Sequence, residues 1–285
     1  MSAGPTRLVI DGQSRRIELE YQLLPGPALS PLIVFLHEGL GSVSMWRGFP
    51  AQLCQHLGCR GLVYSRPGYG QSSPRLPDEH WAPDYLEHQA AHILPQLLHG
   101  LNITEPVWLL GHSDGGSIAL LCAILQAERE KAGLPPASFM QVEAVIVMAP
   151  HIMVEDLSVR SIEEARQAYL KGDLRQGLSR HHADPDSAFW GWNQAWLSDG
   201  FRRWSIEDRL HQIKVPLLAI QGQADEYGTL EQIRGIARRV PQTELLELPD
   251  CGHSPQRDQP EALMSRIEAF LRKQGQLGPD PNRKS

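Results

Sequence analysis

The 285-residue chain has 41% hydrophobic residues and a formal net charge of −6, with acidic and basic residues interspersed. This composition suits one large α/β domain or two small ones, and without a basic patch it argues against a nucleic-acid partner. No apolar run is long enough to span a membrane, and the N-terminal residues lack a signal-peptide pattern. The four cysteines, Cys54, Cys59, Cys122 and Cys251, show no disulfide framework, so we expect a reduced, cytoplasmic protein.

The first half of the chain alternates apolar runs with amphipathic segments. Two alternating stretches joined by Asp11-Gly12 predict an antiparallel hairpin. Continuous apolar runs predict strands that are buried on both faces. In chain order we expect strands at 7–11, 15–22, 32–36 and 61–64, with helices at 45–57 and 84–101, the second bent or restarted at Pro95. A strand from Val107, a helix at 117–130 and a strand at 142–148 follow.

The second half changes in character from residue 149 onward. Short helices are expected at 162–172 and 173–182, followed by a stretch rich in Trp and Phe up to residue 204. Strands return at 217–220 and 244–248, with helices at 229–239 and 260–273.

Strands that alternate with helices predict an α/β fold with a mostly parallel sheet of about eight strands and helices on both faces. We expect residues 1–150 and 211–275 to form the core and residues 276–285 a disordered tail. Residues 151–210 are expected to form a helical cap over the carboxyl ends of the strands, where open α/β sheets bind ligands.

A glycine-flanked serine stands between an apolar strand and a helix. The segment is Gly111-His112-Ser113-Asp114-Gly115-Gly116, and its Gly-x-Ser-x-Gly pattern in this context is typical of a nucleophile elbow. So tight a turn needs nearly side-chain-free neighbours, which the glycines supply. Ser113 is therefore the candidate nucleophile.

A serine hydroxyl needs a base, and the base needs an orienting group. Asp225 follows the strand at 217–220, and His253 follows the strand at 244–248. This is the chain order, nucleophile then acid then histidine, that the elbow pattern predicts. Asp225 is the candidate acid and His253 the candidate base, with Asp250 and Asp156 as rival acids.

The oxyanion of an acyl-transfer reaction needs preorganised N–H donors. One is expected from Asp114, which follows the nucleophile, and the other from the loop His37-Glu38-Gly39-Leu40-Gly41. Gly39 is the first choice in that loop and Leu40 the second. Glu38 is unusual so close to a developing negative charge; it either braces the loop or contacts the substrate.

These segments together resemble the α/β-hydrolase superfamily over about residues 20–275. They are the loop at 37–41, Arg66-Pro67-Gly68-Tyr69-Gly70-Gln71-Ser72, the elbow, Gly222-Gln223-Ala224-Asp225 and Gly252-His253. The chain is similar to capped, cofactor-free serine esterases and C–C bond hydrolases. The resemblance implies a Ser113–Asp225–His253 triad and no cofactor. Glu38 departs from the family's usual glycine, and Ser65 from a common aspartate.

The expected partner is a small molecule, and the sequence leaves homo-oligomerisation open. Leu40, His151 and Trp190 are the candidate substrate-binding residues, because each is predicted near the strand ends or in the aromatic cap. His151 and the pair His181-His182 lack further ligands at metal-site spacing, so no metal is expected. We expect acyl transfer from a small, partly apolar ester or thioester. The alternatives are C–C bond hydrolysis of a ketone-bearing acid, which needs a pocket for a carboxylate, and ligand binding with negligible turnover.

Overall fold

The fold is organised around one eight-stranded mixed sheet. The computed structural model describes residues 6–12, 15–76, 78–135 and 140–277. The strands are β1 (Thr6–Asp11), β2 (Arg16–Leu24), β3 (Leu32–Leu36), β4 (Arg60–Tyr64), β5 (Val107–His112), β6 (Val142–Met148), β7 (Leu217–Gly222) and β8 (Thr243–Leu248). Their order is β1-β2-β4-β3-β5-β6-β7-β8. The β1–β2 and β2–β4 pairs are antiparallel and the other pairs are parallel, which confirms the predicted α/β class.

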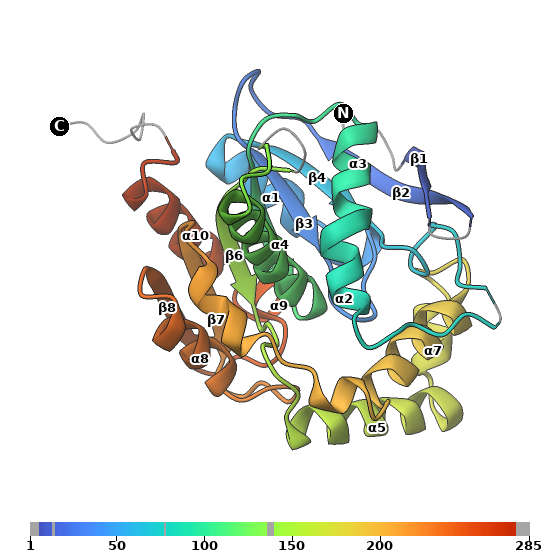
Figure 1. Cartoon of the computed structure of the whole chain (residues 1–285). Helices are drawn as coiled ribbons and strands as arrows, with labels where there is room; N and C mark the ends of the chain where they lie inside the picture. The colour runs from blue at the N-terminus through green and yellow to red at the C-terminus, as the bar shows by residue number, and fades with distance from the viewer. Residues whose placement is uncertain (1–5, 13–14, 77, 136–139, 278–285) are drawn as a thin grey trace.

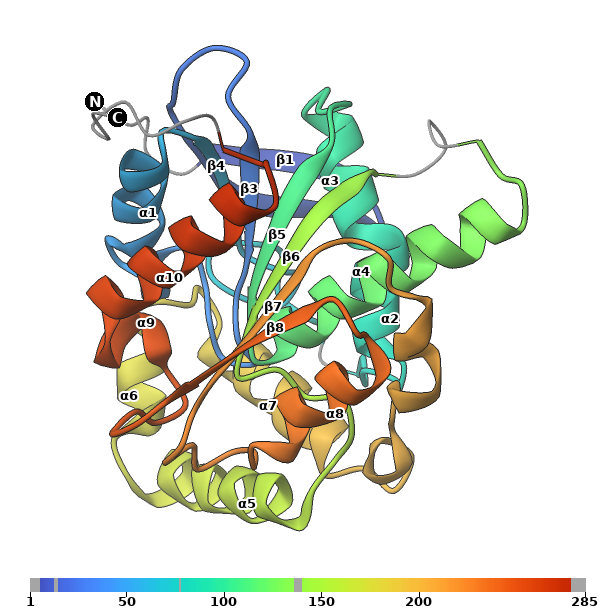
Figure 2. The same ribbon diagram turned by 90° about the vertical axis from the view of Figure 1, so that its left-hand side faces the viewer.

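Helices cover both faces of this sheet (Figures 1 and 2). On one face lie α1 (Phe49–Leu57) and α10 (Pro260–Lys273), with the short α9 (Pro255–Asp258) beside α10. The other face carries α2 (Tyr85–His88), a π-helical turn (Gln89–Ile93), α3 (Leu94–Gly100), α4 (Asp114–Lys131) and α8 (Glu231–Arg239). The buried side chains of β3, β5 and β6 are divided between the two faces and form a core on each side.

The segment between β6 and β7 is helical. It contains α5 (Asp156–Lys171), α6 (Leu174–Leu178) and α7 (Pro185–Trp196). Figures 1 and 2 show α5 and α7 lying across one end of the sheet, the end at which the parallel strands finish. Loops that follow the strands therefore meet this helical segment.

The predicted elements differ from the observed ones mainly at helix starts. Helix α4 begins at Asp114 rather than 117, because the chain turns directly from Ser113 into the helix. Helix α5 begins at Asp156 rather than 162, since the buried Ser158 interrupts the apolar pattern; its hydroxyl instead donates to the Tyr227 carbonyl, 2.6 Å away. The helix predicted at 45–57 is split, because Arg47 has a φ of 53° and ends a 3₁₀ turn before α1 begins.

Other sequence predictions agree with the structure more closely. The hairpin of β1 and β2 is confirmed. The helix predicted at 84–101 changes from π-helical to α-helical at Leu94, next to Pro95, which cannot donate to the carbonyl of Ala91. Of the predicted disordered tail at 276–285, residues 278–285 lie outside the described residues.

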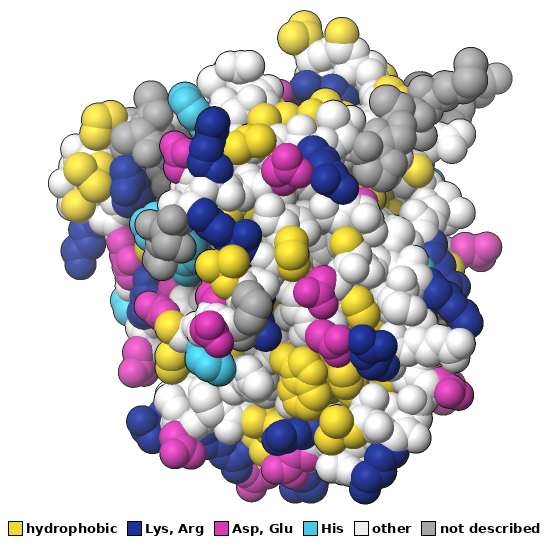
Figure 3. Space-filling view, turned by 90° about the vertical axis from the view of Figure 1, so that its right-hand side faces the viewer, with side chains coloured by type: hydrophobic (Ala, Val, Ile, Leu, Met, Phe, Trp, Pro, Cys, Tyr) yellow, Lys and Arg dark blue, Asp and Glu magenta, His cyan; other side chains and the backbone are white. Residues whose placement is uncertain are grey.

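The surface and the cysteines add two further facts. On the face shown in Figure 3, acidic and basic side chains are interspersed among small hydrophobic patches. All four cysteines are free and buried. Among the helices that the structure describes, none combines the length and apolar character needed to cross a bilayer.

Gly115 offers a test of the packing between α4 and β3. A Cβ atom at Gly115 would collide with the backbone carbonyl of Leu36, whereas one at Gly116 would lie 3.0 Å from the Pro150 side chain. Alanine favours a helix over glycine by about 1 kcal/mol, but overpacking against backbone costs about 1–3 kcal/mol. Gly115→Ala should therefore lower the urea midpoint of unfolding well below that of the matched control Gly116→Ala. Equal midpoints for the two variants would contradict this packing account.

Candidate functional site

Ser113 sits at the apex of the turn between β5 and α4. Its backbone has φ 52° and ψ −119°, a conformation that non-glycine residues rarely adopt. A Cβ atom at Gly111 would collide with the carbonyl of Gly115, so the strand and the helix can approach closely only because both residues are glycine. The Ser113 N–H donates to the Met148 carbonyl, 2.9 Å away, which ties the turn to the end of β6.

The Ser113 hydroxyl is free within the described part of the chain. No hydrogen bond joins its Oγ to His253 or to another described group, and the residue is 6% exposed. Contacts between a nucleophile and its base are often long in unliganded sites and tighten when substrate binds. The hydroxyl is thus available to a ligand beside the positive end of α4.

Asp225 and His253 are directly hydrogen-bonded. Asp225 follows β7 and His253 follows β8, and His253 Nδ1 lies 2.8 Å from Asp225 Oδ1. The same carboxylate accepts hydrogen bonds from the Tyr227 N–H at 2.8 Å and from Gln221 Nε2 at 3.0 Å. Asp225 is thus fixed by three donors, and it in turn fixes the tautomer of His253 with its proton on Nδ1.

The two groups shift each other's pKa in opposite directions. Burial opposes ionisation of Asp225, but the hydrogen bond and charge of His253, together with the Tyr227 N–H, outweigh it and lower the pKa of the carboxyl. Burial also opposes the charged form of His253, yet the Asp225 carboxylate raises the pKa of this imidazole above its ordinary value. Asp225 is therefore poised to stabilise an imidazolium.

His112 ties the loop of His253 to the nucleophile turn. His112 Nε2–H donates to the backbone carbonyl of His253 at 2.7 Å, and the two rings are 5.1 Å apart. Because His112 directly precedes Ser113, this bond holds His253 beside the turn. The structure thus joins Asp225 to His253 directly and ties the loop of His253 to the residue before Ser113.

The two rival acids lie elsewhere. Asp156 is the first residue of α5; its side chain is 76% exposed and pairs with Arg202. Asp250 lies in an exposed turn with φ 51°. Neither is recorded in contact with His253 among the described residues, whereas Asp225 is bonded to it.

The backbone of the loop after β3 is held in one orientation. The Glu38 carbonyl accepts hydrogen bonds from His37 Nδ1 at 2.7 Å, Arg66 Nη2 at 2.8 Å and the Gly41 N–H at 3.1 Å. In a trans peptide the N–H points away from the carbonyl, so the Gly39 N–H is turned away from these three donors. Gly39 therefore presents a fixed N–H that has no recorded backbone acceptor among the described residues.

The Glu38 side chain folds back over its own loop. Its Oε2 lies 3.4 Å from His112 Nδ1, and a Cβ atom at Gly41 would lie 2.5 Å from the same oxygen. Burial opposes its ionisation, but the interaction with His112 lowers the pKa of Glu38 to about 2. This geometry matches the first of the two interpretations, in which Glu38 braces the loop.

Arg66 and Asp114 form a buried charged pair behind this loop. Arg66 is 1% exposed; its Nη1 lies 3.4 Å from Asp114 Oδ2, and its guanidinium lies 4.7 Å from the centre of the Tyr69 ring. The Asp114 carboxylate also accepts hydrogen bonds from the Tyr85 hydroxyl at 2.7 Å and Trp196 Nε1 at 3.2 Å. Arg66 is occupied by protein partners and offers no free cation to a substrate carboxylate.

A cap histidine clamps the same loop from the other side. His182 Nε2–H donates to the Leu40 carbonyl at 3.0 Å, while its Nδ1 accepts from the Gly70 N–H at 2.8 Å. These roles require a neutral ring, and burial lowers the pKa of His182 to about 4. The loop that carries Gly39 and Leu40 is thus braced by Arg66 and by a residue of the helical segment.

His151 lies beside His253, whereas Trp190 packs against residues of α5. The His151 ring lies 4.8 Å from that of Trp196 and 6.2 Å from that of His253, and burial lowers its pKa to about 4. Among the residues that the structure describes, its Nδ1 has no hydrogen-bond partner. The Trp190 ring packs 5.6 Å from that of Tyr169, under the guanidinium of Arg166.

Trp192 is a site residue that the sequence did not single out. A Cβ atom at Gly39 would collide with its indole Nε1, so Trp192 lies directly against the loop after β3. Residues 190 and 192 of a helix point in nearly opposite directions, about 200° apart. The cluster of tryptophans was the available signal, but helical spacing alone does not say which face meets the core.

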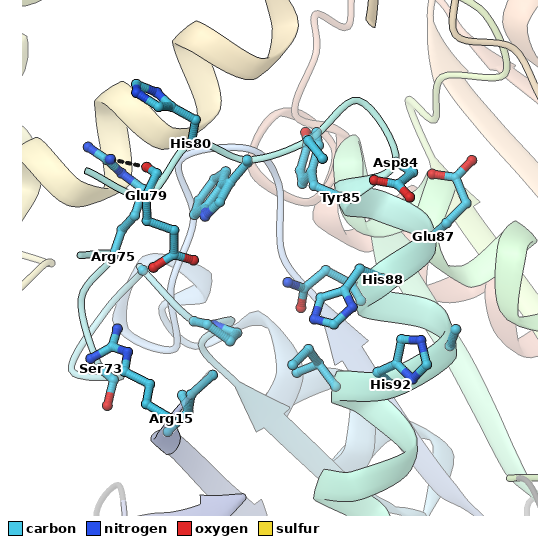
Figure 4. Close-up of a pocket in the computed structure, with 18 of the residues that line it drawn as sticks. Arg15, Ser73, Arg75, Glu79, His80, Asp84, Tyr85, Glu87, His88 and His92 are labelled. Atoms are coloured by element: carbon cyan, nitrogen blue, oxygen red, sulfur yellow. Dashed lines mark hydrogen bonds between the residues drawn. The ribbon is translucent and has the colours of Figure 1, made fainter. Parts of the chain in front are cut away.

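A separate cavity of about 400 Å³ lies between α2 and the loop that precedes it. Figure 4 shows Asp84, Glu87, His88 and His92 on the helical side, facing Arg15, Ser73, Arg75, Glu79 and His80. None of Ser113, Asp225 and His253 lines it. Tyr85 belongs to both regions, because it lines the cavity and also donates to Asp114. Within the described ranges, no group of His, Cys, Asp and Glu side chains is arranged to hold a metal ion.

Known proteins resemble this chain over most of its length. It is 26% identical to the sn-1-specific diacylglycerol lipase ABHD11 of Mus musculus over 275 residues, which cover 90% of this chain and 86% of that protein. It is 21% identical to the proline iminopeptidase of Lactobacillus helveticus, over 89% of this chain and 94% of that protein.

Solved structures share the fold. A thermophilic esterase from Thermogutta terrifontis superposes with a TM-score of 0.69 at 18% identity, covering 95% of this chain and 99% of its own. A meta-cleavage product hydrolase from Pseudomonas fluorescens gives a TM-score of 0.66 at 16% identity, covering 90% and 95%. The model of the alpha/beta hydrolase family matches residues 33–266. With that match on this sheet and this nucleophile turn, the chain belongs to the α/β-hydrolase family.

Proposed function

We propose that this protein is a serine hydrolase that cleaves a small, partly apolar carboxylic ester or thioester by acyl transfer to Ser113. The observation that carries the proposal is the 2.8 Å hydrogen bond between His253 and Asp225, held beside the strained Ser113 turn by His112. A buried aspartate that orients a histidine beside a serine whose hydroxyl is not engaged by another protein group is the arrangement that acyl transfer requires.

The reaction begins with attack of Ser113 Oγ on the substrate carbonyl carbon while His253 Nε2 takes the hydroxyl proton. Asp225 keeps the proton on Nδ1 and stabilises the imidazolium that forms. The carbonyl oxygen becomes an oxyanion, and the N–H groups of Gly39 and Asp114 donate to it. His253 then protonates the leaving alcohol or thiol, and water repeats the sequence to release the acid.

The surroundings of the site favour an ester over a ketone-bearing acid. C–C bond hydrolysis requires a group that holds the substrate carboxylate. Arg66, the cation next to the Gly39 loop, is already bound to Asp114 and the Glu38 carbonyl. Leu40 and the neutral His151 instead suit an uncharged substrate with an apolar part. The similarity to a diacylglycerol lipase supports the same substrate class.

Nitrophenyl esters of increasing acyl length test the proposal. The wild-type protein should hydrolyse them, and Ser113→Ala should reduce turnover by a factor on the order of 10⁶, the loss seen when a comparable triad loses its serine. The measurement is nitrophenol release, with circular dichroism to show that the variant is folded. Turnover that survives the substitution, or a wild-type protein without turnover, would contradict the proposal.

Asp225→Asn tests the assignment of the acid. The amide cannot stabilise the imidazolium and favours the wrong tautomer, so kcat should fall by a factor on the order of 10⁴. Because His253 must be neutral to act as base, kcat/KM should rise with pH through its pKa, which the carboxylate raises. The rising limb should therefore lie above pH 6.5 in the wild type and move to lower pH in Asp225→Asn.

The matched controls are Asp156→Asn and Asp250→Asn, because each removes a carboxylate that is not recorded in contact with His253 within the described part of the chain. Both should keep the wild-type rate and the wild-type pH profile. An Asp225→Asn variant with wild-type turnover, together with an inactive control variant, would overturn the assignment.

A further inference from the structure

Helix α7 contacts both residues that would form the oxyanion hole. Trp196 Nε1 lies 3.2 Å from Asp114 Oδ1, and Trp192, about one turn earlier on the helix, lies against Gly39. Residues 189, 192 and 196 repeat with helical spacing and are all buried, so they form the inner face of α7. The two tryptophans thus reach the site from above, on the side opposite the sheet.

The helix that carries them is firmly placed. Asp184 caps its first turn by accepting from the Ser187 N–H at 2.9 Å. The Ser187 hydroxyl accepts from the Arg75 N–H at 2.7 Å, and Asn193 Nδ2 donates to the Ile162 carbonyl at 3.0 Å. The Trp192 ring also packs edge-on against Phe189, 6.1 Å away. The position of the Trp192 indole is therefore set by the protein itself.

The two indole N–H groups differ in their partners. Trp196 Nε1–H is satisfied, because it donates to Asp114 and also to the Tyr85 hydroxyl at 3.0 Å. Trp192 Nε1–H has no recorded acceptor among the described residues, although the side chain is only 5% exposed. The Trp192 Nε1 atom is also absent from the set of fully inaccessible polar atoms that lack a hydrogen-bond partner. A donor in this position is open to whatever occupies the site next to Gly39.

We propose that the Trp192 indole N–H is a third hydrogen-bond donor to the substrate, directed at the carbonyl oxygen that the Gly39 and Asp114 N–H groups also bind. The inference rests on the proposed serine-hydrolase function. It assigns a catalytic residue to the helical segment and explains why residue 39 must be glycine: a side chain there would displace the indole. The site then accepts substrates whose carbonyl oxygen reaches under Trp192.

The physical effect follows from the charge that develops on that oxygen. A fixed donor in a site from which water is largely excluded stabilises an oxyanion more than a neutral carbonyl. Loss of the N–H should therefore lower kcat rather than raise KM. A tryptophan that only fills space would show the reverse, or would change stability alone.

The test replaces Trp192 in the full-length protein by β-(3-benzothienyl)alanine, which keeps the ring shape but has sulfur in place of the N–H, and separately by Phe. The readouts are kcat and KM for a nitrophenyl ester and the Ki of a trifluoromethyl ketone, whose adduct with Ser113 carries an oxyanion. We expect kcat to fall about 10²-fold and the trifluoromethyl ketone affinity to fall by a similar factor, with KM within about threefold. Trp190→Phe, on the same helix but packed against Tyr169, is the matched control and should behave as wild type.

The possible results separate the inference from the function on which it rests. A wild-type protein without ester turnover would overturn the proposed function itself. An active wild type whose benzothienyl variant keeps full kcat and full inhibitor affinity would overturn only the role of Trp192. Equal losses in KM and in inhibitor affinity, with kcat retained, would also overturn it, because they would identify a packing contact rather than a donor.

Discussion

The strained backbone of Ser113 is the feature on which the rest of the site depends. A non-glycine residue at φ 52° and ψ −119° costs about 1–3 kcal/mol and persists only where its surroundings leave no alternative. Here β5 ends and α4 begins within a single residue, and the close approach of Gly111, Gly115 and Leu36 closes the turn. The strain holds the hydroxyl clear of the sheet and directs the first N–H groups of α4 toward the same place.

Buried charged and histidine side chains surround this turn, and they are hydrogen-bonded to other groups of the protein. His37 and His182 act as neutral rings that hold the loop after β3, and burial lowers the pKa of both. Arg66, from the loop after β4, donates to the Glu38 carbonyl, and the Glu38 side chain contacts His112. The consequence is a Gly39 N–H whose direction is fixed before substrate arrives, so little reorganisation is needed when charge develops.

The helical segment between β6 and β7 is part of the same network and does more than cover it. Trp196 reaches the Asp114 carboxylate, His182 reaches the Leu40 carbonyl, and Trp192 meets Gly39. These three contacts connect α7 and the turn after α6 to the two proposed oxyanion donors, Gly39 and Asp114, or to Leu40, which directly follows Gly39. We therefore expect substitutions in this segment to affect the proposed reaction centre.

Much of this arrangement could be predicted from the sequence, because strand ends are local signals. Apolar runs that stop at Gly111, Gly222 and Leu248 mark one edge of the sheet, and the loops that carry Ser113, Asp225 and His253 follow there. The role of His112 could not be predicted, because its partner is a backbone carbonyl 141 residues away.

Trp192 was missed for a related reason. Trp190 and Trp192 stand in the same aromatic cluster, and only the rotation of α7 about its axis decides which of them meets Gly39. That rotation is set by tertiary contacts such as those of Asn193 and Ser187. The spacing of aromatic residues in the sequence does not reveal it.

The central claim is that Ser113 is a nucleophile activated by its surroundings, and covalent labelling tests it most directly. A fluorophosphonate reacts with an activated serine and leaves a stable adduct that intact-mass and peptide mass spectrometry can locate. The account predicts one adduct per chain, on the peptide that contains Ser113.

 Labelling should be lost in Ser113→Ala and strongly slowed in Asp225→Asn, because the hydroxyl is reactive only while His253 can take its proton. An adduct on another residue, or labelling of Ser113 no faster than that of ordinary surface serines, would contradict the account.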